Sequence, residues 1–269
     1  MTSEEKRVSR IGVFDSGIGG LTVARELISQ FPQTDLVYLG DTARLPYGAK
    51  SKETVTRYAV RCVQFLIDAN VDQVVVACNT ASAHAIPTLR ETFVEMPILG
   101  VVAPGAQAAV QATQSGVIGV IGTEGTVSSN SYPEAIRALL PGAEVVSLAA
   151  PLLVPLAEVG WLDHEVTNLT LKTYLAPLFA EAPAMDTLVL GCTHYPALKP
   201  AIARVCKSLN RAINLVDSAQ AVTAALAGSL TPGTSGRRIC VTDLPERFHR
   251  VATTFFGEKI RGVEHVDIT

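Results

Sequence analysis

The chain has 269 residues, of which 48% are hydrophobic and 17% charged, and its formal net charge is -3. This length and apolar content allow one large or two medium domains with a sizeable core and exclude an intrinsically disordered chain. No run or stripe of Lys and Arg is present, so nucleic acid is not expected as a partner.

The charged N-terminal segment leads directly into a predicted strand, so no secretion signal is expected. No apolar run reaches the roughly 18 to 20 residues that a membrane span needs. We therefore expect a cytoplasmic protein that does not associate with membranes.

Short β-rich segments alternate along the chain with longer segments of helical periodicity. The predicted strands span residues 11–14, 36–39, 73–78, 98–102, 117–121, 144–148, 187–192 and 214–216. The predicted helices between them span residues 21–30, 54–69, 132–140, 164–179 and 200–209. This alternation, with continuous apolar strands, predicts an α/β fold of mainly parallel sheets flanked by helices.

A weak internal repeat suggests two similar halves. The strand and Gly-rich turn at residues 11–17 are echoed at 118–125, and the segment 74–80 is echoed at 188–194. The second echo places a cysteine, Cys78 or Cys192, in the same local context twice.

Five cysteines, widely spaced and without a C-x₂-C pair, are expected to be reduced thiols. Cys62 and Cys206 lie in apolar stripes of predicted helices, and Cys240 lies inside a predicted strand at residues 238–242. A buried thiol in such a position behaves as a small hydrophobic side chain. We therefore interpret these three as packing residues.

Cys78 and Cys192 differ because each ends a buried strand, where ligands bind in open α/β sheets. A helix that starts there would favour an anion and lower the pKa of the thiol. Inverting a stereocentre needs two acid/base groups on opposite faces of one carbon, and two lobes with one cysteine each could supply them. Hydrogen-bonding residues follow each cysteine, namely Asn79, Thr80, Thr193 and His194.

The Gly-rich turn at residues 15–20 also allows a dinucleotide-binding oxidoreductase. Thr22 occupies the third glycine position of the G-x-G-x-x-G pattern, which disfavours this alternative. Asp41 ends the next predicted strand, about where a ribose-binding acid would lie, which favours it.

Two further alternatives concern the same strand ends. Zinc could be held by Cys78, Cys192 and His194, although no C-x₂-C or H-x₃-H spacing supports a metal site. A two-lobed amino-acid-binding protein without catalysis is also possible, and the missing secretion signal argues against an extracellular receptor.

Several motifs together resemble those of the glutamate racemase family, within the aspartate/glutamate racemases. They lie at residues 13–21, 45–48, 76–81, 122–126, 190–196 and 216–218. The resemblance implies cofactor-independent racemisation of glutamate, without pyridoxal phosphate or metal, to supply D-glutamate for peptidoglycan. It also implies a homodimer whose subunits have two α/β domains facing across a cleft, at residues 1–101 plus 215–269 and 102–214. Aspartate racemase, or another cofactor-independent racemase of the superfamily, remains the alternative.

The resemblance also assigns roles to single residues. It implies that Cys78 and Cys192 transfer the protons and that Asp15, Glu158 and His194 assist them. By itself, Glu158 would be interpreted as an exposed carboxylate at a helix end. The implied substrate contacts are Asp15, Ser16, Tyr47, Gly48, Asn79, Thr80, Thr193 and His194.

Overall fold

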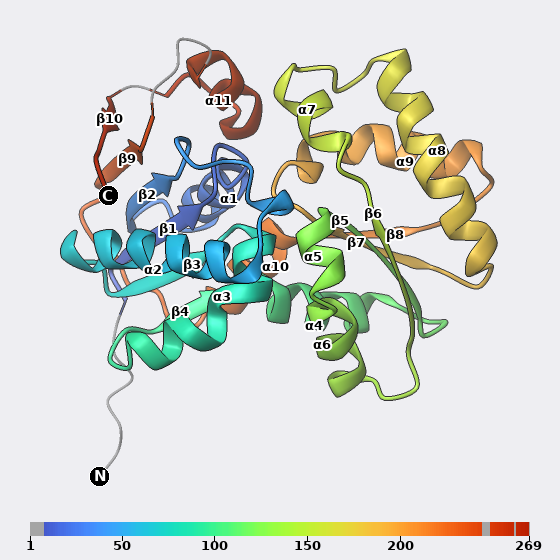
Figure 1. The fold of residues 1–269 in the computed structure, drawn as a ribbon, viewed down its shortest axis with the longest axis horizontal. Coiled ribbons are helices and arrows are strands. Elements are labelled where there is room, and N and C mark those ends of the chain that lie inside the picture. Colours follow the sequence, from blue (N-terminus) through green and yellow to red (C-terminus); the bar gives the residue numbers. More distant parts are fainter. Residues whose placement is uncertain (1–7, 244–247, 261, 269) are drawn as a thin grey trace.

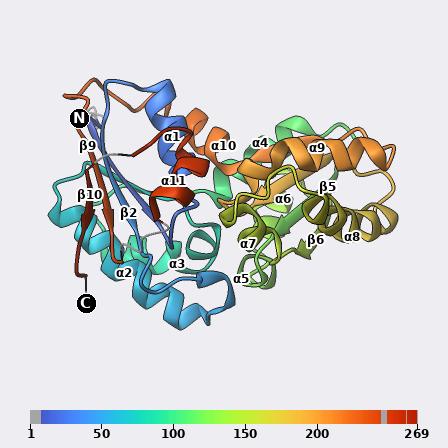
Figure 2. The same ribbon diagram turned by 90° about the horizontal axis from the view of Figure 1, so that it is seen from above.

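The computed structural model describes residues 8–243, 248–260 and 262–268. Two β-sheets lie side by side in separate lobes, with helices on their faces (Figure 1, Figure 2). Their strand orders are β10-β9-β2-β1-β3-β4 and β6-β5-β7-β8, and the strand pairs in the described part of both sheets are parallel. The predicted α/β class with two mainly parallel sheets is confirmed.

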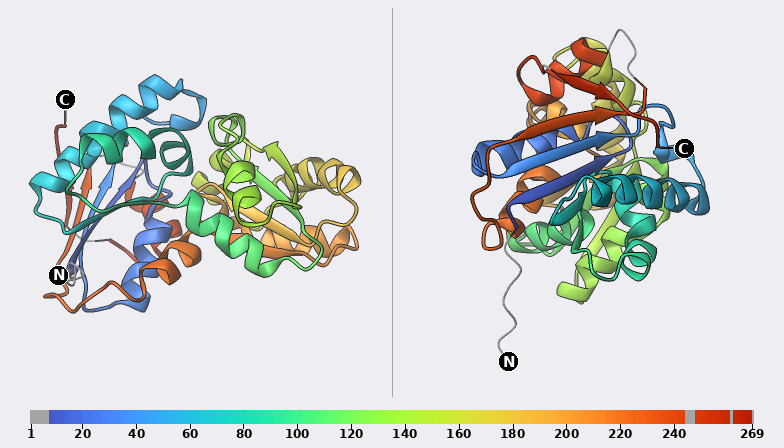
Figure 3. Two further views of the ribbon diagram at one scale, coloured as in Figure 1. Left: turned by 90° about the horizontal axis from the view of Figure 1, so that it is seen from below. Right: turned by 90° about the vertical axis from the view of Figure 1, so that its left-hand side faces the viewer.

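The first lobe holds the six-stranded sheet, whose strands lie side by side in the right-hand view of Figure 3. Its strands are β1 (Arg10–Asp15), β2 (Asp35–Gly40), β3 (Gln73–Val76), β4 (Ile98–Gly100), β9 (Arg237–Val241) and β10 (Val263–His265). Its helices are α1 (Leu21–Gln30), α2 (Lys52–Asp68), α3 (Asn79–Thr92) and α11 (Phe248–Phe256), with the short 3₁₀ helix η1 (Tyr47–Ala49).

The second lobe holds β5 (Val117–Gly122), β6 (Glu144–Ala149), β7 (Thr187–Gly191) and β8 (Asn214–Asp217). Its helices are α4 (Val102–Ala112), α5 (Glu124–Ser128), α6 (Ser131–Leu139), α7 (Leu153–Glu158), α8 (Glu165–Glu181), η2 (Tyr195–Leu198) and α9 (Lys199–Ser208). Helix α10 (Ser218–Leu226) packs against both α1 and α4 and so joins the lobes.

The repeat detected in the sequence corresponds to a repeated topology. The order β2-β1-β3-β4 in the first sheet matches the order β6-β5-β7-β8 in the second. β3 and β7 are therefore equivalent strands, each next to the first strand of its half. Because Cys78 and Cys192 follow these two strands, they occupy equivalent places in the two lobes.

Two predicted strands end two residues earlier than expected, because a helix begins within or directly after the predicted segment. The segment 73–78 leaves the sheet at Val76, since the Cys78 side chain caps the start of α3. The segment 98–102 leaves it at Gly100, and α4 begins at Val102. In the second segment the β-branched Val101 and Val102 suggested a longer strand, whereas in the first the residues that leave the sheet are Ala77 and Cys78.

The domain limits inferred from the resemblance remain a prediction. β8, which contains residues 215–217, pairs with β7 and so belongs to the second sheet. The chain then returns through α10 to β9 and β10 of the first sheet. Within the described ranges, no helix has both the length and the apolar character to cross a membrane.

One apolar core runs through both lobes. Val13 and Val75 of the first sheet and Leu188 of the second belong to the same buried cluster. Ala219 and Val222 of α10 are part of this cluster too. Burying a side chain of the size of valine stabilises the fold by about 1.5 to 3 kcal/mol, so burial of Val222 helps to hold α10 between the lobes.

Candidate active site

A cavity of about 200 Å³ opens between residues of the two lobes, and both Cys78 and Cys192 line it. Its first-lobe wall consists of Ser16, Gly17, Leu45, Pro46, Tyr47, Gly48, Ala49, Cys78, Asn79 and Thr80. Its second-lobe wall consists of Thr123, Glu124, Pro151, Val154, Pro155, Glu158, Cys192, Thr193 and His194. The carboxyl ends of β3 and β7 therefore face one shared space, as the two-lobe hypothesis requires.

Cys78 is held at the N-terminus of α3. Its thiol donates to Ser16 Oγ at 3.4 Å, and the backbone N–H of Ala81 donates to Cys78 Sγ at 3.5 Å. Burial, with a further contribution from the Asp15 carboxylate, raises the pKa of the Cys78 thiol to about 12. The expectation that the helix N-terminus would lower this pKa is wrong, because the loss of solvation outweighs the two hydrogen bonds.

On the other wall, three side chains form a chain of contacts. Cys192 Sγ lies 3.8 Å from His194 Nδ1, and His194 Nε2 lies 3.2 Å from Glu158 Oε1. Burial disfavours the charged imidazole, but the hydrogen bonds with Cys192 and Glu158 outweigh it and raise the pKa of His194 to about 10. The raised pKa keeps the imidazole of His194 protonated near neutral pH, which places a positive charge 3.8 Å from the sulfur of Cys192.

The ring of His194 is also held from the first lobe, where Phe255 of α11 packs edge-on against it at 5.0 Å between centroids. Glu158 is not the freely exposed carboxylate that its sequence context suggested. It ends α7 at the cavity wall and pairs with His194.

Asp15 is fully buried and does not itself line the cavity. Its carboxylate accepts from the backbone N–H of Gly17 at 3.0 Å and from Thr193 Oγ1 at 3.4 Å, which connects it to the other lobe. Burial raises the pKa of Asp15, while the nearby His194 charge lowers it. Asp15 therefore lies behind the cavity wall, and its direct contact with a substrate remains a prediction.

The other predicted contacts, Ser16, Tyr47, Gly48, Asn79, Thr80 and Thr193, all line the cavity. The amide of Asn79 is oriented by its neighbours, because Oδ1 accepts from Tyr132 OH at 2.7 Å and from Ser218 Oγ at 3.3 Å. Its Nδ2 has no hydrogen-bond partner among the described residues and is left as a donor. The Thr80 hydroxyl meets that of Thr123 at 2.8 Å across the lobes.

The charge of the cavity wall follows from the side chains that line it. Among the described residues that line it, none is Lys or Arg, so His194 is the cationic side chain of the wall. Hydroxyl, amide and backbone groups supply the remaining donors. In the described ranges, no group of three or more His, Cys, Asp or Glu side chains is arranged to hold a metal ion.

Other cavity residues were not predicted individually. Thr123 and Glu124 lie in the motif at residues 122–126. The Thr123 side chain caps the N-terminus of α5, and both residues line the cavity. Pro151, Val154 and Pro155 are apolar residues at the start of α7, and no chemical pattern in the sequence distinguishes them. Asp41, considered as a ribose-binding acid, lies fully buried outside the cavity.

Comparison with known proteins identifies relatives over nearly the full length. The model of the Asp/Glu/hydantoin racemase family matches residues 12–226. A glutamate racemase of Geobacter metallireducens is 48% identical over 266 residues, covering 96% of each chain. A glutamate racemase of a Sulfurihydrogenibium species is 47% identical over 262 residues, covering 96% of this chain and 98% of the relative.

Solved structures agree with this result. The glutamate racemase of Francisella tularensis, crystallised with D-glutamate, superposes with a TM-score of 0.88 at 34% identity, covering 98% of each chain. A glutamate racemase isoform of Bacillus anthracis superposes with a TM-score of 0.89 at 39% identity, covering 96% of this chain and 97% of that one. On this evidence the chain belongs to the Asp/Glu/hydantoin racemase family and is an amino-acid racemase.

Proposed function

We propose that the protein interconverts L- and D-glutamate without a cofactor, using Cys78 and Cys192 as a pair of acid/base groups. The observation that carries this proposal is that the two thiols follow equivalent strands of two similar sheets and line one cavity. The choice of glutamate is supported by the relatives, which are named glutamate racemases, one of them crystallised with D-glutamate.

The protonation states suit opposite roles. The Cys192 thiolate, beside the His194 imidazolium, takes the α-proton from one face of the substrate. The Cys78 thiol, whose pKa is about 12, gives its proton to the other face of the carbanion. The product is the enantiomer, with Cys192 left as thiol and Cys78 as thiolate. In the reverse direction the high pKa of Cys78 is an advantage, because its thiolate is then a strong base.

The neighbours support this exchange. Glu158 stabilises the His194 charge, and Asp15, from behind the wall, strengthens the basicity of the Cys78 thiolate. We propose that the carboxylates of the substrate are held by donors of the wall rather than by Lys or Arg. These donors are Ser16, Asn79, Thr80, Thr193, His194 and the turn at Tyr47 and Gly48.

We also propose the wider context implied by the family resemblance. The D-glutamate would serve peptidoglycan synthesis in the cytoplasm, and the protein would act as a homodimer. Two domains, at residues 1–101 plus 215–269 and at 102–214, would face each other across the cavity, with the second limit moved past β8 because that strand pairs with β7. Sedimentation of the purified protein tests the dimer.

The function is tested with purified protein and L-glutamate, without added cofactor, by following the optical rotation. In D₂O, deuterium should appear at the α-carbon of the product, because one thiol exchanges its proton with solvent before donating it. Cys78→Ala and Cys192→Ala should each abolish racemisation without unfolding the protein. Cys206→Ala, at a buried thiol of α9 outside the cavity, is the matched control and should keep the activity.

Three outcomes would contradict the proposal. Parental racemisation by either cavity variant would exclude the two-thiol mechanism. Binding of glutamate without α-proton exchange would favour a non-catalytic binding protein. A higher kcat/KM for aspartate than for glutamate would replace the proposed substrate with the shorter amino acid.

A further inference from the structure

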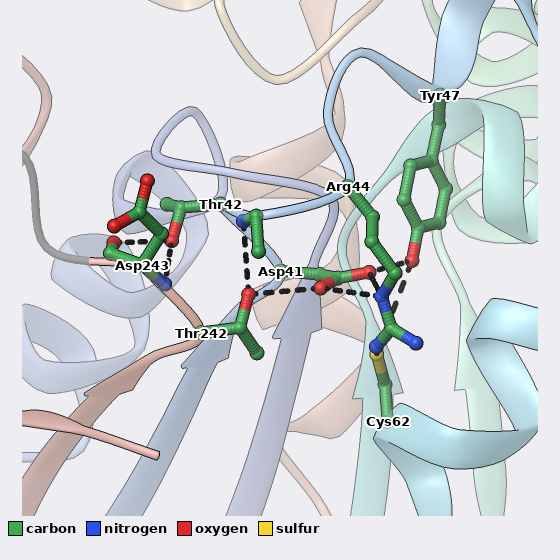
Figure 4. Close-up of polar contacts among 8 residues, drawn as sticks. Asp41, Thr42, Arg44, Tyr47, Cys62, Thr242 and Asp243 are labelled. Carbon is green, nitrogen blue, oxygen red and sulfur yellow. Dashed lines mark hydrogen bonds and ion pairs between the residues drawn. The ribbon is translucent and has the colours of Figure 1, made fainter. Parts of the chain in front are cut away.

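A buried carboxylate outside the cavity organises the loop that forms part of its wall. Asp41, directly after β2, is fully buried and accepts from Arg44 Nε at 2.9 and 2.8 Å, one distance to each oxygen. It also accepts a short hydrogen bond from the hydroxyl of Tyr47. Figure 4 shows both side chains of the loop turned back onto this one carboxylate.

The same carboxylate is joined to the C-terminal part of the chain. Thr242, which follows β9, donates from Oγ1 to Asp41 Oδ1 at 2.9 Å and accepts from the backbone N–H of Ala43 at 3.0 Å (Figure 4). The next residues repeat the connection, since the backbone N–H of Asp243 donates to Thr42 Oγ1 at 2.8 Å. The start of the loop, from Asp41 to Ala43, is therefore hydrogen-bonded to the residues that follow β9.

From this anchor the loop reaches the cavity. The ring of Tyr47 packs against Phe14 and Tyr58, at 6.1 and 5.8 Å between centroids, and is almost completely buried. The backbone of the next residue, Gly48, lies so close to Thr123 of the other lobe that a Cβ on it would come within 2.7 Å of the threonine Cβ. Small displacements of Tyr47 would thus move the wall where the two lobes meet.

We propose that Asp41 is a positioning residue for substrate binding, which holds Tyr47 and thereby the cavity wall at residues 47–49 in its binding geometry. This inference rests on the proposed function, because it assigns the turn at Tyr47 and Gly48 to the substrate. Arg44 forms an ion pair with Asp41, and its guanidinium carbon lies 4.7 Å from the centroid of the Tyr58 ring. The guanidinium is therefore not one of the groups that line the cavity.

The chain contains a matched control at the other end of β2. Asp35 is also a buried carboxylate, it also pairs with an arginine, Arg10, and it accepts from Thr234 and Gly236 just before β9. Asp35 and Asp41 therefore fasten opposite ends of the same pair of strands. Of these two carboxylates, only Asp41 also binds side chains of the loop whose residues 45–49 line the cavity.

The experiment compares Asp41→Asn with Asp35→Asn. Both variants should lower the midpoint of thermal unfolding. If the loop of Asp41→Asn is in its binding geometry for a tenth of the time, the KM for glutamate should rise about tenfold with kcat within about twofold. The KM of Asp35→Asn should stay at the parental value. Equal changes of KM in the two variants, or no change in either, would overturn the proposal.

A second variant tests the route through Tyr47. Because Asp41 acts on the wall through the tyrosine hydroxyl, Tyr47→Phe and Asp41→Asn should not be additive, and the double variant should have the KM of the more impaired single variant. Independent effects that multiply would contradict this route. Should Asp41→Asn fail to fold, Thr242→Val removes one donor to Asp41 and is judged by the same KM and kcat criteria.

Hydrogen exchange separates this inference from the proposed function. Backbone amides of residues 43–49 should exchange faster in Asp41→Asn than in the parent and stay protected in Asp35→Asn. If the parent does not racemise glutamate, the proposed function fails while the exchange rates still show whether Asp41 holds the loop. Unchanged exchange in Asp41→Asn would overturn the positioning role even in an active enzyme.

Discussion

Replacing His194 with asparagine removes the cation beside Cys192 while keeping a polar side chain of similar reach. His194 is only 8% exposed, so solvent screens its charge weakly. Burial opposes that charge, yet the hydrogen bonds with Cys192 and Glu158 raise the pKa from 6.5 to about 10. This rise corresponds to roughly 5 kcal/mol in favour of the imidazolium.

If about half of this energy is due to the contact with Cys192, the interaction between the two side chains amounts to about 2 to 3 kcal/mol, because the coupling between two sites is reciprocal. Losing it should lower kcat/KM by about 30- to 150-fold. The two enantiomers are equally stable, so kcat/KM must fall equally in both directions. The two directions should differ instead in the kinetic isotope effect on kcat/KM. This isotope effect should increase for the enantiomer whose α-deuteron Cys192 removes.

The assay is circular dichroism of the racemisation, started from each enantiomer and repeated with α-deuterated substrate. A His194→Asn variant within about twofold of the parent would refute the reasoning. The raised pKa also predicts stability that is complete below about pH 6.5 and lost as the pH rises towards 10. Urea unfolding across this range should show the loss in the parent and not in the variant.

Three other substitutions have defined outcomes. The pKa of Asp186 is lowered to about 2 because hydrogen bonds outweigh burial. Because solvent screens this partly exposed carboxylate, Asp186→Asn should cost only about 1 kcal/mol in urea unfolding near neutral pH. That difference should vanish as the pH falls from 3.8 towards 2. Gly19→Ala would place a methyl group 2.4 Å from Thr193 Oγ1, so both the thermal midpoint and kcat should fall, as calorimetry and the racemase assay would show. Tyr132→Phe removes a donor to Asn79 Oδ1, and the KM for glutamate should rise about fivefold for a loss of about 1 kcal/mol.

Much of the fold was predictable because its signals are local. The apolar run around Val75 gave a buried parallel strand, and the helical period at residues 54–69 gave α2. The helices 79–92 and 102–112 were not predicted. The first contains Asn, Thr and Pro87, and the second begins in β-branched residues, so local propensity disagrees with the helix that packing stabilises.

The sequence by itself determined the chemical types in the site and their order at the strand ends: Cys78 with its polar successors, and Cys192 followed by Thr193 and His194. The tertiary structure alone decided their energetics. Burial raised the pKa of Cys78 against the expectation from the helix N-terminus, and the contact of Glu158 with His194 joined residues 36 positions apart. Such effects depend on solvent exclusion and on pairings between residues far apart in the sequence, which are set by distances in space rather than by neighbours along the chain.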